Sequence, residues 1–530
     1  MRIVTNEEMR QLDETAVKTI GIPSSILMEN AGLEAARLIS QTCVNKNYEG
    51  EVLIFCGKGK NGGDGLAVAR RLIANGHRVR VFLLHNIDEY AGESAMNLNI
   101  LKNLKAKVSV ADTPAVIEEY FKSAVPPFIV VDAILGTGIK RDVEGLYYDS
   151  IELINRYADE VISLDIPSGI IGDSGRFAGT SIHATSTISF GYPKLGHFLA
   201  PGAARRGKLY HVDLGFPRSW AKEGDKFLLT HESIAPLLQS RDRFGHKNSF
   251  GHCLLIGGSP GRVGAIVMAS NSCLKMGTGL VTVASWEDSF PALEMKLSAE
   301  IMNFKITRES GKENEDFYVP KPGLSAFSSM IIGPGLGLRP DGGEVLRRLL
   351  QGYPGPLVID ADGLNLIAEY KFHDLIAKRQ APTVLTPHPG EMSRLLGTGK
   401  ESIVDDPVAC VKEAVERTGA IIVLKGATTL IHSTDGNTWF NHYPNDGMAT
   451  AGSGDVLAGM IGGLLGQRMS ALEATRLGVY AHSLAGKFAA EHLGHRAMTA
   501  LDIIGNIHLA FRDLRQHESG TVTGPCVELY

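Results

Sequence analysis

Short apolar runs that end in glycine- and aspartate-rich turns recur along the chain, and they constrain its fold more than any other feature. In the first unit, residues 51–56 (EVLIFC) precede the turn at 57–65, a helical segment LAVARRLIANG and a second apolar run RVRVFLL. This order is a βαβ unit, in which a helix joins two parallel strands. The same rhythm restarts at His252. The sequence therefore predicts an α/β protein with open parallel sheets.

The length of 530 residues predicts more than one domain. The strand and helix patterns assign residues 1–222 to a first α/β domain and residues 230–515 to a second. Residues 217–230 are polar and irregular between them, as expected of a linker. The tail at 516–530 is also polar, and we assign it no function.

The composition excludes several classes of protein. A net charge of −5 gives no electrostatic reason to expect a nucleic-acid or membrane partner. No run approaches the roughly 18 apolar residues of a membrane span, and the charged N-terminus lacks the apolar core of a secretory signal. The six cysteines form no C-x-x-C pair, which argues against a disulfide framework or a zinc site. We therefore expect a cytoplasmic protein.

The turn at 57–65 contains the spacing G-x-G-x-x-G at Gly57, Gly59 and Gly62. Such a turn is typical of dinucleotide binding, but the chain lacks a clear acidic residue at the end of the second strand, so the match is weak. Lys58 and Lys60 lie in the same turn. They either contact substrate phosphates or are merely solvated, and the sequence leaves both interpretations open.

Polar side chains follow the apolar runs of the first domain. A lone aspartate at such a place is often a turn former, but several together favour a binding site. Because the carboxyl ends of parallel strands meet at one edge of a sheet, we expect these side chains to converge. Their oxygens suit a hard cation. The side chains are Asn61, Asp64, Asp132, Asp165 and Ser168.

Residues 445–467, NDGMATAGSGDVLAGMIGGLLGQ, predict a site for negative charge. Gly452, Ser453 and Gly454 permit a tight turn before an apolar helix, and the start of a helix offers unpaired N–H groups and the positive end of its dipole. Asp455 falls in the first turn, where it either caps the helix or accepts a proton. A glycine-rich loop with a capping aspartate is the alternative.

Four more side chains follow later strands of the second domain and should face this turn. Each has a structural alternative: Asp360 and Asp362 can cap helices, His388 can pack between two prolines, and Lys425 can be a surface charge. Together they indicate a crevice at the carboxyl edge of a second sheet.

The motifs NGGDG, DAILGTG, LDIPSG and GYPKLG, preceded by MENAG, resemble the epimerase domain of NAD(P)H-hydrate repair enzymes over nearly all of residues 1–220. The resemblance implies a Rossmann-like fold that interconverts the R and S epimers of hydrated NADH and NADPH (NADHX and NADPHX). It implies that Asp165 moves protons, with Lys194 as a weaker candidate. It also implies that Asn61, Asp132 and Ser168 ligate K+, and that the hydrate contacts Lys60, Asn61, Gly62, Gly63, Asp64, Gly136, Thr137, Gly138, Ile139, Lys140, Arg141, Asp142 and Asp165.

Six motifs in order over residues 230–510, IGGSPGRVGA, GPGLG, DADGLN, TPHPGE, LKGATT and GMATAGSGD, resemble the nucleotide-dependent (S)-NAD(P)H-hydrate dehydratase domain. This resemblance implies a ribokinase-like fold in which Asp455 is the catalytic base. It implies that Ala265, Gly335, His388 and Asp455 contact the hydrate. The adenine nucleotide would contact Lys425, Gly426, Ala427, Thr428, Thr429 and Gly454. Ser453 stands where threonine is usual, and Asp446 where proline is common.

The two resemblances imply one repair pathway. The second domain would use Mg2+ with ADP or ATP to phosphorylate the hydroxyl of the S epimer. Loss of this group as phosphate would then restore NADH or NADPH. The first domain would supply that epimer, and a homo-oligomer is expected by analogy. One alternative is a small-molecule kinase of the ribokinase type, with a ligand-binding first domain and a phosphate ester as its product. Another is a sensing or scaffolding first domain, against which Asn61, Asp132 and Asp165 argue.

Overall fold

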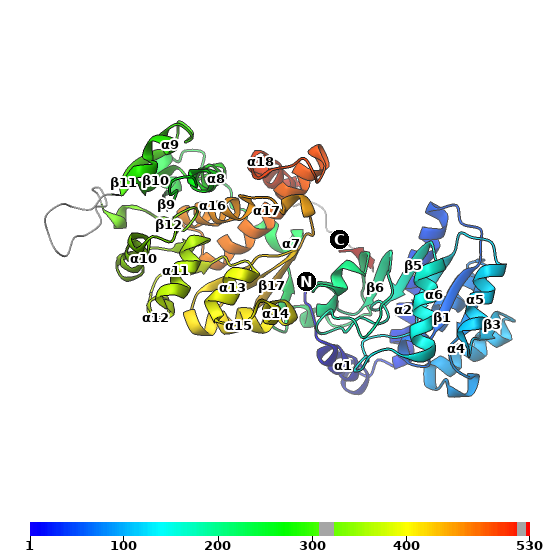
Figure 1. Cartoon of the computed structure of the whole chain (residues 1–530). Helices are drawn as coiled ribbons and strands as arrows, with labels where there is room; N and C mark the ends of the chain where they lie inside the picture. The colour runs from blue at the N-terminus through cyan, green and yellow to red at the C-terminus, as the bar shows by residue number, and fades with distance from the viewer. Residues whose placement is uncertain (307–322, 517–525, 530) are drawn as a thin grey trace. The chain divides into compact units, whose positions relative to one another are not determined.

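The computed structural model describes residues 1–306, 323–516 and 526–529, and it divides the chain into two compact units (Figure 1). The first unit comprises Arg2–Gly224 with Val522–Tyr530, and the second comprises Met1 with Asp225–Thr521. Each unit contains one largely parallel sheet with helices, so the predicted α/β class is confirmed.

The sheet of the first unit has the strand order β18-β7-β6-β5-β4-β1-β2-β3, and all its neighbours are parallel except β18 and β7. Its strands β1 and β4 are buried throughout, which explains why they read as continuous apolar runs. The strands are β1 (Val52–Cys56), β2 (Val79–Leu83), β3 (Lys107–Val110), β4 (Ile129–Ala133), β5 (Glu160–Leu164), β6 (Ser186–Phe190), β7 (Lys208–Val212) and β18 (Cys526–Glu528).

Helices cover both faces of this sheet. Alternate residues of β1 point to opposite sides, so that Ile54 packs in one apolar cluster and Phe55 in another. The first cluster includes side chains of α1 (Asn6–Thr15), α2 (Ser24–Asn45), α3 (Lys60–Ala74) and α4 (Gly92–Asn103), and the second includes those of α5 (Pro114–Ser123) and α6 (Gly145–Tyr157). The unit therefore has three layers.

The sheet of the second unit has the order β11-β10-β9-β12-β13-β14-β15-β16-β17-β8. Neighbours are parallel except β16, which runs antiparallel to both β15 and β17. The strands are β8 (Lys226–Leu228), β9 (His252–Ile256), β10 (Leu280–Trp286), β11 (Met302–Ile306), β12 (Ser329–Ile332), β13 (Leu357–Ile359), β14 (Thr383–Leu385), β15 (Ile421–Leu424), β16 (Thr428–His432) and β17 (Thr438–His442).

Two groups of helices lie on opposite sides of this sheet (Figure 1). On one side, α8 (Val263–Lys275), α16 (Ser453–Gly466), α17 (Ala471–Leu493) and α18 (Ala500–Gln516) pack on one another and share an apolar cluster with the sheet. The other group comprises α10 (Pro340–Gly352), α11 (Asp362–Tyr370), α12 (His373–Ala377), α13 (Pro389–Leu396), α14 (Lys400–Asp405) and α15 (Pro407–Thr418). The nearly all-apolar α16 is buried along most of its length.

Two short strands lie where the sequence predicts none. Strand β8 forms inside the expected linker, where it pairs with β17 and Phe227 stacks on Trp439 with ring centroids 4.8 Å apart. Strand β18 forms in the polar tail and pairs with β7. Both have three residues, too few to show the alternation that reveals a strand.

Within residues 1–306, 323–516 and 526–529, no helix combines the length and the apolar content that a transmembrane segment needs.

Candidate active sites

The crevice of the first unit lies between β1 and β4, where the strand order reverses direction. The loop after β1 enters α3, and the loop after β4 begins at Ile134. The loop after β4 contacts the first turn of α3, because a Cβ atom added at Gly136 would lie 3.3 Å from the Cβ of Asn61. The strand order therefore brings the two predicted loops together.

Asp132, the penultimate residue of β4, is fully buried at the base of this crevice. Its carboxylate accepts hydrogen bonds from the Oγ of Ser163 (2.8 Å) and from the N–H (2.9 Å) and Oγ (2.5 Å) of Ser168. Burial raises the pKa of Asp132, and these hydrogen bonds oppose the shift. Asp132 thus ties the ends of β4 and β5 together.

Asn61 and Ser168 meet at the backbone of Leu135. The carbonyl of Leu135 accepts a hydrogen bond from Asn61 Nδ2 (3.0 Å) and lies 3.1 Å from Ser168 Oγ. The Oδ1 of Asn61 is buried and has no hydrogen-bond partner among the residues that the structure describes. The unpaired Oδ1 of Asn61 thus accompanies the carboxylate of Asp132, the hydroxyl of Ser168 and the carbonyl of Leu135. All these groups offer oxygen, which fits a hard cation.

Asp165 follows β5 and has a left-handed backbone, with φ of 64°. Its carboxylate accepts hydrogen bonds from Lys194 Nζ and from the Phe190 N–H (3.3 Å). Lys194 is only 1% exposed, and its Nζ also donates to the Phe190 carbonyl across 2.9 Å. A buried ammonium with an ion-pair partner in an unusual backbone conformation is typical of a functional site.

His197 contacts the backbones of both residues of this pair. Its Nδ1 accepts from the Lys194 N–H (3.1 Å), and its Nε2 lies 3.0 Å from the Asp165 carbonyl. Burial lowers the pKa of His197 well below its ordinary value, and the charges of Lys194 and Arg206 add to the shift. The ring is therefore neutral, and because Nδ1 accepts, Nε2 carries the proton and donates to Asp165.

Asp64 adds a third carboxyl to the crevice. Burial raises its pKa well above the ordinary value, with further contributions from the charges of Asp165 and Asp13. Asp13, which the sequence analysis missed, is on α1. It lies one helical turn after Met9, so both side chains are on the same face of α1. Met9 packs against Gly191, because a Cβ atom added at Gly191 would lie 2.6 Å from the Met9 Cε. The sequence feature that could have identified Asp13 is an acidic residue at a helix position where the spacing predicts an apolar one.

The predicted substrate loop at 136–142 is partly exposed. Thr137 and Ile139 are half-buried, whereas Lys140, Arg141 and Asp142 are exposed. Asn6 at the start of α1 donates from Nδ2 to the Thr137 carbonyl across 2.8 Å, so α1 fixes one end of the loop. Gly62 and Gly63 are buried in the first turn of α3, and Lys60 is exposed there.

In the second unit, the predicted anion site is the start of α16. Gly452 precedes the helix with φ of 94°, a left-handed conformation that favours glycine. The first-turn N–H groups of Gly454 and Asp455 have no intrahelical acceptor because of their position. A Cβ atom at Gly454 would lie 3.2 Å from the Nζ of Lys425. Backbone donors and an ammonium therefore meet at one place.

Several carboxyls surround Lys425. Its Nζ lies 2.7 Å from Asp360 Oδ1 and 3.8 Å from Glu391 Oε2. Burial lowers the pKa of Lys425, but the charges of Asp360 and Glu391 outweigh it, so the net shift is upward. Burial and the charge of Asp360 raise the pKa of Asp455 to about 7, although Lys425 opposes them. Lys425 is thus a paired, largely buried cation and not a surface charge.

The turn after β13 is strained. Ala361 has φ of 49° and ψ of −119°, a conformation that residues other than glycine rarely adopt. It separates Asp360 from Asp362, whose Oδ2 accepts from the Gly337 N–H (2.8 Å) and lies 3.3 Å from Arg262 Nη1. Asp360 therefore pairs with Lys425, and Asp362 binds the loop after β12.

His388 caps α13. Its Nδ1 accepts from the N–H groups of Gly390 (2.9 Å) and Glu391 (3.3 Å), while the Glu391 carboxylate accepts from the His388 N–H (2.8 Å). Burial and then the charge of Lys425 lower the pKa of His388. Glu391 was missed as a site residue, and its signal was the capping-box spacing from His388.

The remaining predicted residues of this unit fall into two places. Gly335, with φ of 60°, lies beside Ala265, because a Cβ atom added there would be 3.3 Å from that of Ala265. Thr428 and Thr429 begin β16, directly after Lys425, Gly426 and Ala427. Thr429 Oγ1 donates to the Gly426 carbonyl across 3.3 Å.

A buried histidine on α17 supports the turn before Asp455. His482 Nε2 lies 3.0 Å from the Ser453 carbonyl and 3.5 Å from the Ser453 Oγ. Burial lowers the pKa of His482 to about 4, so its ring is neutral near pH 7. Its Nε2–H donates to the Ser453 carbonyl, which fixes the orientation of the first turn of α16.

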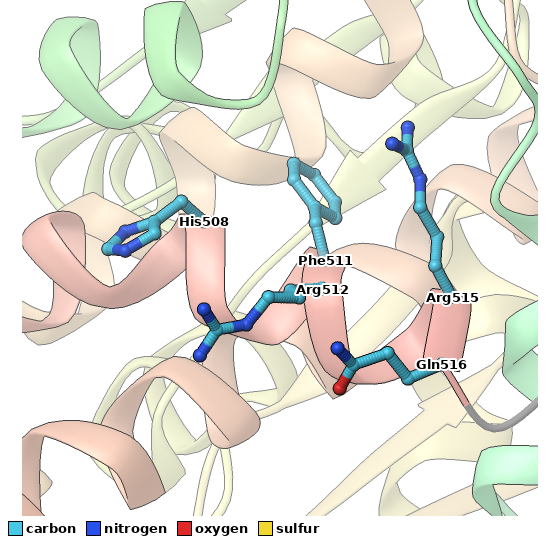
Figure 2. A pocket seen from close by; sticks show the side chains of 5 residues that line it. All are labelled: His508, Phe511, Arg512, Arg515 and Gln516. Carbon is cyan, nitrogen blue, oxygen red and sulfur yellow. The ribbon is translucent and has the colours of Figure 1, made fainter.

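A separate hollow of about 320 Å³ lies on α18 (Figure 2). It is lined by His508, Phe511, Arg512, Arg515 and Gln516, all of them from this one helix. None of these belongs to the predicted sites.

Both halves of the chain are similar to known proteins. Residues 24–196 match the family model described as YjeF-related protein N-terminus, and residues 253–509 match that of NAD(P)H-hydrate dehydratase. The bifunctional NAD(P)H-hydrate repair enzyme Nnr of Moorella thermoacetica is 39% identical over 97% of this chain and 98% of its own length. The enzyme of the same name from Thermofilum pendens is 36% identical, with 97% of each chain covered.

Solved structures are also similar to this chain. One of them is a ribokinase-like superfamily protein from Enterococcus faecalis V583 with 26% identity and a TM-score of 0.47, covering 55% of this chain and 97% of its own.

Proposed function

The chain belongs to the family of bifunctional NAD(P)H-hydrate repair enzymes, and we propose from this membership that it restores NADH and NADPH from their hydrates. We assign epimerisation of R and S NADHX and NADPHX to residues 1–222, and dehydration of the S epimers to residues 230–515. The match of two family models in this order supports the assignment.

The convergence of Lys425, Asp360 and the start of α16 beside Asp455 carries the dehydration proposal. Asp455 removes the proton from the C6 hydroxyl as that oxygen attacks the terminal phosphorus of ATP or ADP. The first-turn N–H groups and Lys425 stabilise the charge on the transferring phosphoryl group. Loss of phosphate from C6 and of a proton from C5 then restores the C5–C6 double bond, with AMP as the other product from ADP.

The substrates are assigned to the loops that face Asp455. Ala265, Gly335 and His388 contact the hydrate, and residues 425–429 with Gly454 hold the adenine nucleotide. The carboxyls of Asp360 and Glu391 lie 2.7 and 3.8 Å from the Nζ of Lys425, and carboxylate oxygens are ligands that suit Mg2+. Asp360 and Glu391 would hold the ion, which supplies charge neutralisation for the phosphates when bound.

In the first unit, we assign proton transfer during epimerisation to Asp165, with Lys194 as its ion-pair partner. Asp64, whose pKa is raised by burial, contacts the hydrate together with residues 60–63 and 136–142. Asn61, Asp132 and Ser168 would hold K+, whose charge favours the anionic groups around it when bound. That the chain is a cytoplasmic homo-oligomer stays a prediction.

The test uses an R and S mixture of NADHX with the enzyme, Mg2+ and either ADP or ATP, and follows the near-ultraviolet absorbance of NADH. We expect nearly complete recovery, and the active nucleotide identifies the phosphoryl donor. Recovery that ends with the S fraction would remove the epimerase assignment. A stable phosphate ester in place of NADH would favour the small-molecule kinase.

A further inference from the structure

A cluster of four polar side chains lies beside the glycine turn of the first unit, outside the site described above. The Oε2 of Glu89 accepts from Lys58 Nζ (2.9 Å) and lies 3.1 Å from His85 Nδ1. The other ring nitrogen, His85 Nε2, lies 2.8 Å from the hydroxyl of Tyr147. These contacts join residues from three different loops and helices into one polar surface.

The cluster lies at the carboxyl edge of the sheet. Lys58 follows β1, and His85 comes two residues after the end of β2. The hydroxyl of Tyr147 would be 3.2 Å from a Cβ atom at Gly57, the first glycine of the G-x-G-x-x-G turn. The polar surface therefore adjoins the turn that opens α3, on the side away from Asp165.

The distance along the sheet suits a dinucleotide. Asp165 follows β5, and the order β5-β4-β1-β2 puts three inter-strand steps of about 4.8 Å, or about 14 Å, between the ends of β5 and β2. If the hydrated ring lies at Asp165 and the pyrophosphate at the start of α3, an extended dinucleotide carries its adenosine toward β2. In dinucleotide-binding folds, a side chain near the carboxyl end of the second strand, here β2, contacts the adenosine ribose.

We propose that Lys58, Glu89 and His85 form a subsite for the 2′ substituent of the adenosine ribose, and that this subsite discriminates NADPHX from NADHX. The inference rests on the proposed epimerase function. Glu89 accepts a hydrogen bond from the 2′-hydroxyl of NADHX. In NAD-binding folds an acidic residue at the end of the second strand makes this contact, and here Glu89, six residues after β2, replaces it. With NADPHX, Lys58 leaves Glu89 and pairs with the 2′-phosphate.

The charges of the cluster allow both substrates. Lys58 holds the pKa of Glu89 below its usual range, so the carboxylate is anionic and attracts a hydroxyl but repels a phosphate. The 2′-phosphate carries about two negative charges at neutral pH and attracts Lys58. Glu89 and Lys58 therefore favour different substrates. Their side chains are 40% and 51% exposed, which leaves them accessible to a ligand.

The test compares kcat/KM for epimerisation of (R)-NADPHX and (R)-NADHX by the full chain without added nucleotide, with the epimers separated chromatographically. We expect Glu89→Gln to raise the ratio of NADPHX to NADHX about fivefold, and Lys58→Gln to lower it about fivefold, as for the loss of one exposed charge contact. The opposite directions distinguish the subsite from a general loss of activity.

Lys46→Gln is the matched control. Lys46 forms an ion pair with Glu160 across 2.6 Å, and its side chain is 53% exposed, close to the value for Lys58. Glu160 is the first residue of β5, so this pair lies at the opposite edge of the sheet. Its variant should leave the ratio unchanged. An unchanged ratio in the Glu89 and Lys58 variants, or an equal change in all three, would overturn the subsite. A wild-type chain that epimerises neither substrate would instead overturn the proposed function.

Discussion

The Nζ of Lys425 lies 2.7 Å from Oδ1 of Asp360, and this ion pair stands against the first turn of α16. The pairing holds a cation at the place where helix N–H groups also converge. Asp360 has a second effect, because its negative charge raises the pKa of the neighbouring Asp455. One carboxylate thus positions the lysine that we propose binds the phosphoryl group, and it makes Asp455 a stronger proton acceptor.

Replacement of Asp455 by asparagine should remove the proton acceptor and keep the size of the side chain. We expect kcat for dehydration of (S)-NADHX to fall about 10²- to 10⁴-fold, the usual contribution of a general base. Epimerisation in the other unit serves as an internal control for folding and should be unaffected. A rate near that of the wild type would remove Asp455 from the mechanism.

The pH dependence of dehydration should follow the same carboxyl. Because the pKa of Asp455 is raised to about 7 and the ionised form accepts the proton, kcat/KM should fall as the pH drops through about 7. Asp360→Asn removes a negative neighbour, so the pKa of Asp455 should decrease and the acid limb should move to lower pH. Measured pH profiles of the two proteins check this shift, and an acid limb that stays in place would contradict it.

Asp165→Asn should separate the two activities. The variant loses the carboxylate that pairs with Lys194, so conversion of the R epimer should stop while dehydration of the S epimer continues. With an R and S mixture, NADH recovery should end at the S fraction. Addition of the Asp455→Asn variant, whose epimerase unit is intact, should restore complete recovery. If the Asp165 variant alone recovers all the NADH, Asp165 does not transfer the proton.

Removal of K+ should affect only the first unit. Exchange of K+ for tetramethylammonium, which is too large for a site of protein oxygens, should stop epimerisation and leave dehydration of the S epimer unchanged. Asn61→Ala removes the buried, unpartnered Oδ1 and should raise the K+ concentration required for half-maximal epimerisation about tenfold. Equal activity with both cations would show that the oxygen cluster around Asp132 is structural.

Much of the fold was predictable because the central strands are apolar and buried on both faces. The run at 51–56 differs from β1 by one residue, and the capping box of Thr5 and Glu8 starts α1. Strands β8 and β18 were not predictable, since each contains three residues at the edge of a sheet. Their pairing depends on partners far away in the sequence.

The candidate sites were predictable where a polar residue directly follows a strand. Asp165 and Asp360 are of this kind, since the carboxyl ends of parallel strands share an edge. Asp13 and Glu391 were missed because each is on a helix and has an ordinary local explanation. Only the tertiary structure brings Asp13 toward Asp64, and Glu391 within 3.8 Å of Lys425.

His482 offers a test of how the first turn of α16 is held. Its neutral ring donates from Nε2 to the Ser453 carbonyl across 3.0 Å, two residues before Asp455. His482→Leu removes this donor, so the turn should lose its fixed orientation and kcat for dehydration should fall about tenfold, equivalent to about 1.4 kcal/mol. His482→Gln supplies an N–H group at a similar distance from the backbone and should recover most of the rate.

Epimerisation by both His482 variants should stay at the wild-type level, because that activity belongs to the other unit. The KM for the adenine nucleotide should change less than kcat, since Lys425 still binds the phosphates. A merely structural role would predict equal losses in the leucine and glutamine variants, with thermal unfolding temperatures that fall in proportion. Recovery by glutamine alone would therefore identify the hydrogen bond to Ser453, and not the volume of the ring, as the contribution of His482 to dehydration.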